Sequence, residues 1–514
     1  MSEELAQALG ESSQAELVET HISWLILGRE TVYKLKKPVD LGFLDFSTLE
    51  KRRRACEDEL RLNRRTAPHI YEAVVPVSGT ESAPLLDDDS AVIDYALRMR
   101  RFDNSKQLDR LAGSGALGAD AMDALAEAVA GFHDGIRGAE APADCGTPEA
   151  ILAPARENFE ALAELDHHAE DQALLDELRE WTEQEYRRRE ADFATRREQG
   201  FVRECHGDLH LGNIYYADGR AVPFDCIEFS AALRWIDVMA DIAFTVMDLI
   251  NHDLPALGYR LLNEYLARTG DYGGVRVLRW YLVYRAIIRA KVAAIRAGQD
   301  KEHAGELDSQ CSHYLQLAGR LAQPGESALI LMCGLSGTGK TTIARDLAGD
   351  LEAIHLRSDV ERKRLHGLAM TDSSHESGLD IYTRQASERT FSHLEQLTAD
   401  VLACDLPVIV DATFIGRALR RRFTDLARRL SVPWLIVECT ATEEQVRERL
   451  AARSGDASEA GLQQYIDQRE AFEPFTDDEL RRRLVVDSEA GTGGLADRVL
   501  DVMNDSSVTK ISEE

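Results

Sequence analysis

The sequence lacks a long hydrophobic run and a paired cysteine motif, and both absences limit the class of protein. No apolar stretch approaches the roughly 18 residues of a membrane-spanning helix. The N-terminus, Met1-Ser2-Glu3-Glu4, lacks the basic and apolar parts of a signal peptide. The 8 cysteines form no Cys-x-x-Cys pair and no metal-ligand spacing, which favours a reducing compartment. We therefore expect a soluble cytoplasmic protein without a membrane partner.

Basic residues are scarce relative to acidic ones. The chain has 60 lysines and arginines against 90 aspartates and glutamates, a formal net charge of −30. Such a surface opposes non-specific binding to phosphate backbones and anionic lipids, so the composition disfavours a nucleic-acid partner. The hydrophobic content of 44% is ample for packed cores, and 514 residues usually divide into about two to four domains.

Residues 334–341 fill every fixed position of the phosphate-binding motif GxxxxGK[ST]. The apolar run 328–333 before the motif predicts a buried strand, and the residues from Thr341 onward predict a helix. This arrangement turns backbone amides and a helix N-terminus toward phosphates. The expected nucleotide contacts are Gly334, Ser336, Gly337, Thr338, Gly339, Lys340, Thr341 and Thr342. Lys340 would reach the β/γ-phosphates of ATP or GTP, and the Thr341 hydroxyl would hold Mg²⁺.

Two acidic residues follow apolar segments near this motif. Asp411 ends the run 407–411, which is typical of a buried parallel strand, and can bind the magnesium or its water shell. Asp359 ends the predicted strand 354–359 and can accept a proton from an acceptor hydroxyl. Arg362, at the start of the next helix, can hold an anionic group on the acceptor. Each acid has a simpler interpretation, a turn cap for Asp411 and a helix N-cap for Asp359.

An arginine-rich helix is predicted over 443–453. Arg449 and Arg453 are four residues apart and share one face. They can close over the transferring phosphates as a cationic lid. The alternative is an ordinary solvated charged helix.

These features resemble the adenylate kinase-like P-loop kinases over about residues 325 to 505. The Asp-x-x-Arg spacing of Asp359 and Arg362 is similar to the acceptor-site motif of polynucleotide 5′-hydroxyl kinases, and gluconate kinases and zeta toxins have a similar layout. The resemblance implies that Asp359 is the general base and that Arg449 or Arg453 is a lid arginine.

A second phosphoryl-transfer signature lies upstream. His206-Gly207-Asp208-Leu209-His210-Leu211-Gly212-Asn213 has the HxDxxxxN spacing of a kinase catalytic loop. Asp208 would orient and deprotonate an alcohol, and Asn213 would hold Mg²⁺. Asp225, after the apolar segment 222–224, would be the second magnesium ligand. The alternative is a polar loop with fortuitous spacing.

A kinase of this kind also needs a phosphate lysine and an acid on the following helix. The predicted strand 31–36 carries Lys34 and Lys36 on one face, and the sequence does not decide between them. In the predicted helix 49–64, Glu57 and Glu59 are the candidate partners, and we favour Glu59. Either acid can instead be an exposed helical residue.

Together these residues resemble the aminoglycoside phosphotransferase family, which has the protein-kinase-like fold, over roughly residues 20 to 320. The catalytic block HGDLHLGN matches closely, although no glycine-rich GxGxxG loop precedes Lys34. The resemblance implies that Asp208 is the base and that His210 lies at the substrate. The acceptor region after Asp225 is where such enzymes diverge most, so an aminoglycoside acceptor does not follow. A predicted helix over 280–296 places Arg285, Arg289 and Arg296 on one face. If that face lines the acceptor cleft, the acceptor is acidic or already phosphorylated; the alternative is that the arginines pair with acids on the domain surface.

The sequence therefore predicts a multidomain protein of α+β and α/β class. A protein-kinase-like bilobal domain is expected over 1–322, a linker over 323–327, a P-loop parallel-sheet kinase domain over 328–503 and a disordered tail over 504–514. The arrangement resembles bacterial fusions of the two kinase types. We expect ATP and Mg²⁺ as cofactors and small-molecule hydroxyl acceptors, such as sugars or sugar acids, at both sites. The alternatives are a polynucleotide 5′-hydroxyl kinase in the C-terminal half, or a nucleotide-sensing module in one half.

Overall fold

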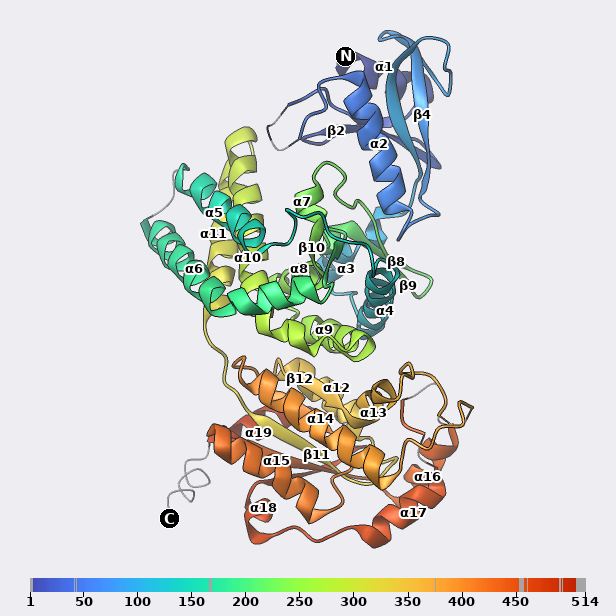
Figure 1. The fold of residues 1–514 in the computed structure, drawn as a ribbon. Helices are drawn as coiled ribbons and strands as arrows, with labels where there is room; N and C mark the ends of the chain where they lie inside the picture. Colours follow the sequence, from blue (N-terminus) through green and yellow to red (C-terminus); the bar gives the residue numbers. More distant parts are fainter. Residues whose placement is uncertain are drawn as a thin grey trace. The chain divides into compact units, whose positions relative to one another are not determined.

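The computed structural model describes residues 3–40, 42, 44–165, 169–374, 376–452, 457–459, 461–489, 491 and 493–504. The chain divides into two compact units (Figure 1). Unit 1 consists of Met1–Asp248 and Ile287–Cys311, and unit 2 consists of Leu249–Ala286 and Ser312–Glu514. Unit 2 therefore takes in a helical segment that lies well before the linker predicted at 323–327. The domain limits expected from the sequence stay a prediction, and the units describe how the chain packs.

A six-stranded antiparallel sheet forms the N-terminal part of unit 1, in the order β1-β2-β3-β6-β4-β5. Its strands are β1 (Glu16–Glu19), β2 (Ser23–Leu27), β3 (Thr31–Lys36), β4 (Tyr71–Thr80), β5 (Ala83–Leu86) and β6 (Val92–Arg100). Helices α1 (Glu3–Ser13) and α2 (Leu49–Asn63) contact this sheet. Thr48 caps α2 by accepting a hydrogen bond from the backbone N of Lys51, so the helix begins where the sequence predicts.

The rest of unit 1 is mainly helical, with short strands around the catalytic-loop motif. The motif lies between β7 (Val202–Glu204) and β8 (Ile214–Ala217), and β8 pairs with β9 (Arg220–Pro223) just before Asp225. The remaining elements up to residue 251 are η1 (Asn104–Lys106), α3 (Leu108–Gly113), α4 (Ala119–Gly135), α5 (Pro148–Ala163), α6 (Ala169–Glu198), η2 (Leu211–Asn213), α7 (Ala231–Arg234), β10 (Trp235–Asp237) and α8 (Val238–Asn251).

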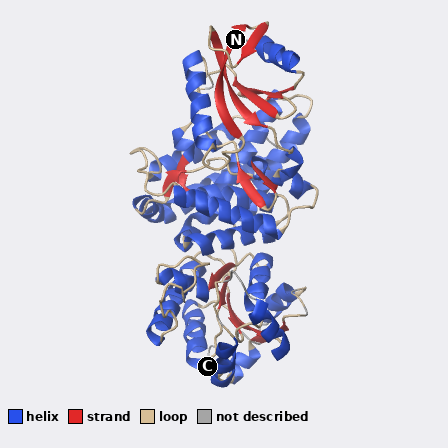
Figure 2. Cartoon of the chain, turned by 90° about the vertical axis from the view of Figure 1, so that its right-hand side faces the viewer, coloured by secondary structure: helices blue, strands red, loops and turns tan. Residues whose placement is uncertain are grey.

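Unit 2 is built on a five-stranded parallel sheet in the order β12-β13-β11-β14-β15. Its strands are β11 (Leu329–Cys333), β12 (Ile354–Arg357), β13 (Val408–Asp411), β14 (Trp434–Thr440) and β15 (Arg483–Asp487). Helices cover both faces of this sheet (Figure 2), so every residue of β11 and β13 is buried. The parallel order brings the ends of β11, β12 and β13 to one edge, where the phosphate-binding loop and both predicted acids follow.

The helices of unit 2 come from two stretches of the chain. The first stretch supplies α9 (Pro255–Thr269), η3 (Tyr272–Gly274) and the first part of α10 (Val275–Gln299). The second begins within α11 (Ala304–Ala322) and supplies α12 (Lys340–Asp350), α13 (Ser358–Leu365), α14 (Arg384–Leu402), α15 (Arg417–Leu430), α16 (Glu443–Ala452), α17 (Leu462–Ala471), α18 (Asp477–Arg481) and α19 (Leu495–Asn504).

The structure corrects one local prediction and leaves two others outside the described residues. Asp359 does not end a strand, because β12 stops at Arg357 and Asp359 lies in the first turn of α13. Helix α16 ends at Ala452, and Arg453 lies outside the described residues, as does the predicted tail beyond Asn504.

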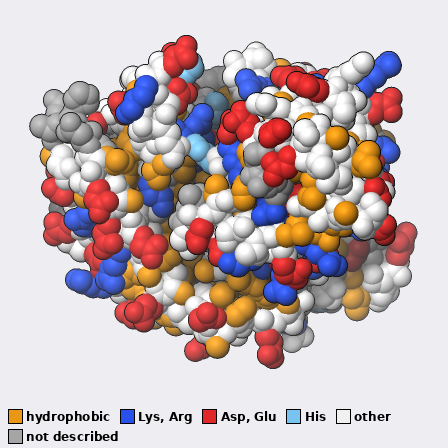
Figure 3. Space-filling model, turned by 90° about the horizontal axis from the view of Figure 1, so that it is seen from above, with side chains coloured by type: hydrophobic (Ala, Val, Ile, Leu, Met, Phe, Trp, Pro, Cys, Tyr) orange, Lys and Arg blue, Asp and Glu red, His pale blue; other side chains and the backbone are white. Residues whose placement is uncertain are grey.

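Charged side chains are spread over the surface. Figure 3 shows acidic side chains scattered over the face that it draws, with lysines and arginines between them. Among the described residues, none of the helices combines the length and the apolar character needed to cross a lipid bilayer.

Candidate active sites

The catalytic-loop motif brings Asp208 and Asn213 into contact. The Asn213 Nδ2 donates hydrogen bonds to the backbone O of Asp208 at 3.0 Å and to its Oδ2 at 3.1 Å. The Asn213 backbone O in turn accepts a hydrogen bond from Phe224 N, which ties the loop to the segment that carries Asp225. Because both donated bonds use the amide nitrogen, the Asn213 Oδ1 keeps its lone pairs for a cation.

His210 lies beside the same carboxylate. Its Nε2 is 3.6 Å from Asp208 Oδ2. Burial alone would lower the pKa of His210, but the Asp208 carboxylate outweighs this effect and raises it. Burial correspondingly opposes ionisation of Asp208, yet His210 holds the pKa of that carboxyl well below its usual range. The motif thus provides an ionised carboxylate next to an imidazole that is readily protonated.

Lys34 connects the sheet of unit 1 to Asp225. The Lys34 Nζ is 2.7 Å from Asp225 Oδ1 and 2.8 Å from Glu59 Oε1. Burial would lower the pKa of Lys34, but Asp225 and Glu59 together raise it well above its ordinary value. Asp225 has a φ of 62° and donates its backbone N–H to the Tyr71 hydroxyl. Left-handed backbone at a non-glycine residue is costly and is typical of functional positions.

Lys36 occupies a different, fully enclosed position. Its Nζ is 2.5 Å from Glu59 Oε2 and also pairs with Glu228, and the side chain is 0% exposed. Burial would lower the pKa of Lys36, but Glu228 and Glu59 raise it. Sequence reasoning missed Glu228, although an acid three residues after Asp225 is a visible signal. Of the two lysines on β3, Lys34 donates a hydrogen bond to Asp225, whereas Lys36 acts on that carboxylate through its charge.

Asp241 in α8 holds the start of the catalytic loop and was also missed. It is 0% exposed and accepts hydrogen bonds from the backbone N of His206 at 3.0 Å and of Gly207 at 2.9 Å. His133 Nε2 lies 3.2 Å from the same carboxylate. Gly207 has a φ of 87°, and a Cβ there would lie 2.7 Å from the Leu233 carbonyl. The loop conformation therefore requires glycine and a buried acceptor more than 30 residues away.

The three arginines predicted to share a face of α10 are divided between the units. Arg285 belongs to unit 2 and is buried, whereas Arg289 and Arg296 belong to unit 1. Arg289 is close enough to Asp208 to contribute to the lowering of its pKa, after the larger effects of burial and His210. Arg296 is exposed. The structure thus links Arg289 to the catalytic loop through its charge.

The phosphate-binding loop of unit 2 opens into a cavity of about 1180 Å³. The Lys340 Nζ donates a hydrogen bond to the Leu335 carbonyl at 2.8 Å, and Thr341 Oγ1 donates to Asp411 Oδ2 at 2.7 Å. Burial lowers the pKa of Lys340, and Asp411 opposes this. Burial would raise the pKa of Asp411, but His355, whose Nε2 is 3.4 Å away, and other groups lower it to about 2.

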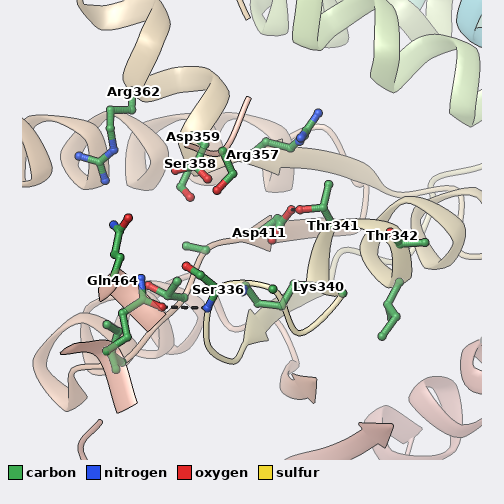
Figure 4. Close-up of a pocket in the computed structure, with 18 of the residues that line it drawn as sticks. Ser336, Lys340, Thr341, Thr342, Arg357, Ser358, Asp359, Arg362, Asp411 and Gln464 are labelled. Atoms are coloured by element: carbon green, nitrogen blue, oxygen red, sulfur yellow. Dashed lines mark hydrogen bonds between the residues drawn. The ribbon is translucent and has the colours of Figure 1, made fainter. Parts of the chain in front are cut away.

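The opposite wall of this cavity carries Asp359 and Arg362 (Figure 4). Burial raises the pKa of Asp359, while a hydrogen bond from Ser458 and the charge of Arg362 work against it. The Arg362 side chain is buried at 6% exposure, and its Nη1 donates to the Ile381 carbonyl and to Ser387 Oγ, both at 3.1 Å. Its guanidinium lies 5.0 Å from the centre of the Tyr382 ring. The Arg362 Nε has no hydrogen-bond partner among the described residues.

Two helices after β14 close the nucleotide side of the cavity. Arg449 in α16 lines it and donates from Nη1 to Ser488 Oγ at 2.7 Å. Gln468 in α17, which sequence reasoning missed, accepts a hydrogen bond from the backbone N of Ser336 at 2.8 Å. The side chain of Gln468 is thus hydrogen-bonded to a backbone amide of the phosphate-binding loop. No spacing rule connects an isolated glutamine to a loop 130 residues earlier.

The buried pair of Lys36 and Glu228 leads to a stability prediction. Lys36→Met should lower the free energy of unfolding by about 3–5 kcal/mol, because it leaves the buried carboxylate of Glu228 without its cation and removes one of the two cations that pair with Glu59. Adding Glu228→Gln should recover part of the loss. Lys51→Met, at an exposed pair with Asp45, should change stability by less than about 0.5 kcal/mol. Urea-induced unfolding measures all four proteins. A stable Lys36→Met protein that cannot bind ATP would instead make Lys36 the phosphate lysine.

The pair of His210 and Asp208 leads to a titration prediction. Asp208→Asn should lower the pKa of His210, which NMR of its ring protons can follow. The raised pKa means that the His210 contribution to stability is fully present below its ordinary value of 6.5 and is lost as the pH rises through the folded value. The variant should lose this part of the pH dependence. An unchanged His210 titration would mean that the two side chains do not interact in solution.

Comparison with known proteins identifies both halves. Residues 42–278 match the model of the phosphotransferase enzyme family, and residues 329–475 match an AAA domain model. The chain is 32% identical over 452 residues to the uncharacterized protein Rv2004c of Mycobacterium tuberculosis (strain ATCC 25618 / H37Rv), covering 86% of this chain and 87% of that protein. The uncharacterized protein Mb2027c of Mycobacterium bovis matches with the same figures.

Solved structures similar to the chain include kinases of both types. A sugar kinase from Janibacter sp. HTCC2649 is 18% identical, covers 36% of this chain and 98% of its own, and has a TM-score of 0.27. A choline kinase from Cryptosporidium parvum Iowa II is 11% identical, covers 60% of this chain and 90% of its own, and has a TM-score of 0.38. These identities are too low to transfer a substrate.

The family models confirm the resemblances expected from the two sequence motifs and the predicted fold class of a kinase-like domain followed by a P-loop domain. The chain therefore belongs to the family that includes Rv2004c, joins a phosphotransferase-family region to a P-loop kinase region, and is an ATP-dependent kinase.

Proposed function

We propose that the protein is a bifunctional phosphotransferase in which each unit transfers the γ-phosphoryl group of ATP to a hydroxyl of a small molecule. The observation that supports the proposal is that each unit brings together a lysine, carboxylates and a further oxygen ligand of the kinds that this reaction needs. Unit 1 has Lys34 against Asp225, with Asp208 and Asn213 in contact. Unit 2 has Lys340, the Thr341–Asp411 pair and Asp359 around one cavity.

In unit 1, Asp208 takes the proton of the acceptor hydroxyl as the hydroxyl oxygen bonds to the γ-phosphorus and ADP leaves. Its depressed pKa keeps it ionised, and this suits a carboxylate that orients the hydroxyl and receives the proton late in the transfer. Lys34 binds the α/β-phosphates and is held by Glu59. Lys36 has a structural role, because its ammonium group is paired with the buried carboxylates of Glu59 and Glu228.

In unit 2, Asp359 accepts the proton of the acceptor hydroxyl, and Lys340 faces the β/γ-phosphates. The raised pKa of Asp359 makes it a stronger proton acceptor once it is ionised. Lys340 donates to the Leu335 carbonyl in this structure, and a phosphate oxygen would replace that carbonyl as its acceptor. Arg449 is positioned at the cavity to stabilise charge that develops on the transferring group.

Both units have donor sets that fit magnesium. The hydroxyl of Thr341 and the carboxylate of Asp411 lie 2.7 Å apart, and Asn213 Oδ1 and the Asp225 carboxylate are the corresponding oxygens of unit 1. Hard oxygen ligands are what Mg²⁺ prefers, and it usually takes only one or two protein ligands besides phosphates and water. When bound, the ion neutralises charge on the β- and γ-phosphate oxygens.

The cavity of unit 2 favours an acceptor that carries a negative charge. Arg362 is a buried cation whose recorded hydrogen bonds go to a carbonyl and a hydroxyl, and its Nε is unpaired among the described residues. The charge of Arg362 acts on Asp359, and a carboxylate or phosphate on the substrate would give the buried Nε a charged acceptor. Asp359 stands on the same helix to receive the hydroxyl proton. A sugar acid or a phosphorylated alcohol has both groups.

The net charge of −30 favours a small acceptor over a polynucleotide, since phosphate contacts dominate nucleic-acid affinity. The test is an ATP-consumption screen of the full chain against sugars, sugar acids, phosphorylated sugars, aminoglycosides, nucleosides and 5′-hydroxyl oligonucleotides. Transfer to a small alcohol supports the proposal. Tight, salt-sensitive binding of the oligonucleotide with transfer to its end would replace it for unit 2, and binding of ATP without transfer to any acceptor would favour a sensing module.

The separate sets of groups predict two reactions that can be silenced one at a time. Asp208→Asn should slow transfer in unit 1 by at least about a hundredfold, because the proton acceptor is lost. Lys340→Ala should slow transfer in unit 2 to a similar extent, because the cation that binds the phosphates is lost. Each variant should keep the other reaction. Calorimetric titration with a non-hydrolysable ATP analogue should show two sites in the wild type. Loss of both activities from either substitution in a folded protein would contradict the prediction.

The cavity of unit 2 predicts a division of labour between two side chains of α13. Asp359→Asn should reduce kcat with little change in ATP affinity, because the base is lost and the phosphate contacts remain. Arg362→Gln should mainly raise the KM for the acceptor. In the wild type, kcat/KM should fall as the pH drops through the raised pKa of Asp359, since the protonated carboxyl cannot accept a proton. Steady-state kinetics from pH 4 to 8 measures each effect. Equal losses in both variants would argue against separate functions.

A further inference from the structure

Helix α9 lies in the part of the chain that matches the phosphotransferase family, yet it belongs to unit 2. The family match runs over 42–278, and α9 spans Pro255–Thr269. Unit 2 includes Leu249–Ala286, and α9 contacts both α12 and β12. The helix that precedes the P-loop region by some sixty residues is therefore built into the P-loop fold. It packs on α12, which begins at Lys340, and on β12, which leads directly into α13 with Asp359 and Arg362.

Asn263 binds the edge of the parallel sheet. Its Nδ2 donates to the Ala353 carbonyl at 2.8 Å, and its Oδ1 accepts from the backbone N of His355 at 2.8 Å. Strand β12 is at the edge of the sheet, so its outer backbone groups have no neighbouring strand. The single carboxamide of Asn263 makes the two hydrogen bonds that another strand would make there. Its 6% exposure shows that the contact is closed to water.

Arg364 joins α13 to the C-terminal end of α9. Its Nη2 donates to the Ala267 carbonyl and its Nη1 lies 3.5 Å from the Arg268 carbonyl, which are among the last carbonyls of that helix. A cation at a helix C-terminus is stabilising because it offsets the partial negative charge of those carbonyls. The chain turns at Gly270 with a φ of 74°, where a Cβ would lie 2.8 Å from Arg364 Nη1.

The same contact fixes the rest of α13. Arg364 Nε lies 3.1 Å from Glu361 Oε2, and Glu361 is 0% exposed. Val360 packs in one hydrophobic cluster with Ala267 of α9 and Ala457. The residue after Ala457, Ser458, forms a hydrogen bond with Asp359. Helix α13 is thus held against α9 through Arg364 and Val360, while Asp359, Arg362 and Ser458 line the cavity.

We propose that α9 and the turn at Gly270 form the supporting wall of the acceptor site in unit 2, and that Asn263 and Arg364 are positioning residues for Asp359 and Arg362. This inference rests on the proposed function of those two cavity residues. It assigns a segment within the phosphotransferase match to the P-loop reaction. Helix α9 also packs on α12, where Glu264 pairs with Arg345 at 3.1 Å. Asn263 instead contacts β12, and Arg364 joins α13 to α9, so we expect substitutions of these two residues to act on the acceptor side.

The test compares full-length Arg364→Ala, Arg364→Lys and Asn263→Leu with the wild type, using the acceptor found in the screen. Arg364→Ala and Asn263→Leu should each raise the acceptor KM about tenfold, because a buried contact is lost and the supporting elements shift. The affinity for Mg-ADP at the P-loop site, measured in an Asp225→Ala background, should change by less than about twofold. Arg364→Lys should recover part of the loss, since it keeps a cation at the α9 carbonyls.

The matched control is Arg428→Ala, which removes an exposed arginine paired with Asp425 and Asp478 in the same unit. It should leave the acceptor KM unchanged. Equal losses of acceptor and Mg-ADP binding in Arg364→Ala would indicate general unfolding of unit 2 and overturn the proposal, as would wild-type kinetics in both Arg364→Ala and Asn263→Leu.

A second measurement separates this inference from the proposed function. Amide hydrogen exchange over 354–365 should speed up in Arg364→Ala and Asn263→Leu, while exchange over 434–440 in β14 should stay unchanged. If the wild type transfers phosphate to no acceptor in unit 2, the proposed function fails, and the exchange result alone decides whether α9 supports β12 and α13. Unchanged exchange over 354–365 would overturn that support.

Discussion

Both candidate sites depend on lysines that are withdrawn from water and must have their charge balanced nearby. Desolvating an ammonium group costs several kcal/mol, which only a close counter-charge offsets. In unit 1 the balance is internal, because Lys34 and Lys36 share the carboxylates of Glu59, Asp225 and Glu228. In unit 2 it is incomplete, because Lys340 donates to a carbonyl and its pKa is lowered by burial. The phosphates of a bound nucleotide would neutralise the charge of Lys340, so nucleotide binding itself would supply the counter-charge that this site lacks.

This difference explains why the two sites need different scaffolds. In unit 1 the carboxylates are held at fixed positions. Asp225 adopts a left-handed backbone conformation, and the buried Asp241 accepts hydrogen bonds from the backbone of the catalytic loop. Unit 2 instead presents backbone amides at the start of α12, and one of these amides is occupied by Gln468. Ligands at such a loop compete with a neutral side chain, which exchanges at lower cost than a buried ion pair.

Much of the fold near each motif could be predicted from the sequence, because those elements are local. The strand before Gly334, the helix after Lys340, the strand of Lys34 and Lys36, and the helix that begins at Leu49 all lie where hydrophobic pattern and capping residues indicate. The end of β12 was misplaced by two residues, since Ser358 and Asp359 are equally suited to a strand end and a first helical turn. Contacts such as Asp241 to His206, or Gln468 to Ser336, join residues far apart in sequence and have no spacing to detect.

The boundary between the two halves shows the same limit at a larger scale. Pattern breaks at 323–327 mark where one motif-bearing region gives way to the next, but they carry no information about which helix packs on which sheet. Helix α9 lies within the phosphotransferase match and packs on the P-loop sheet. The edge strand β12 needs a hydrogen-bond donor and an acceptor there, and the carboxamide of Asn263 supplies both. Because α9 lies within the phosphotransferase match, removing that whole region would also remove a helix that packs on β12 and α12. This dependence concerns folding of the parallel sheet and does not require the two reactions to share a substrate.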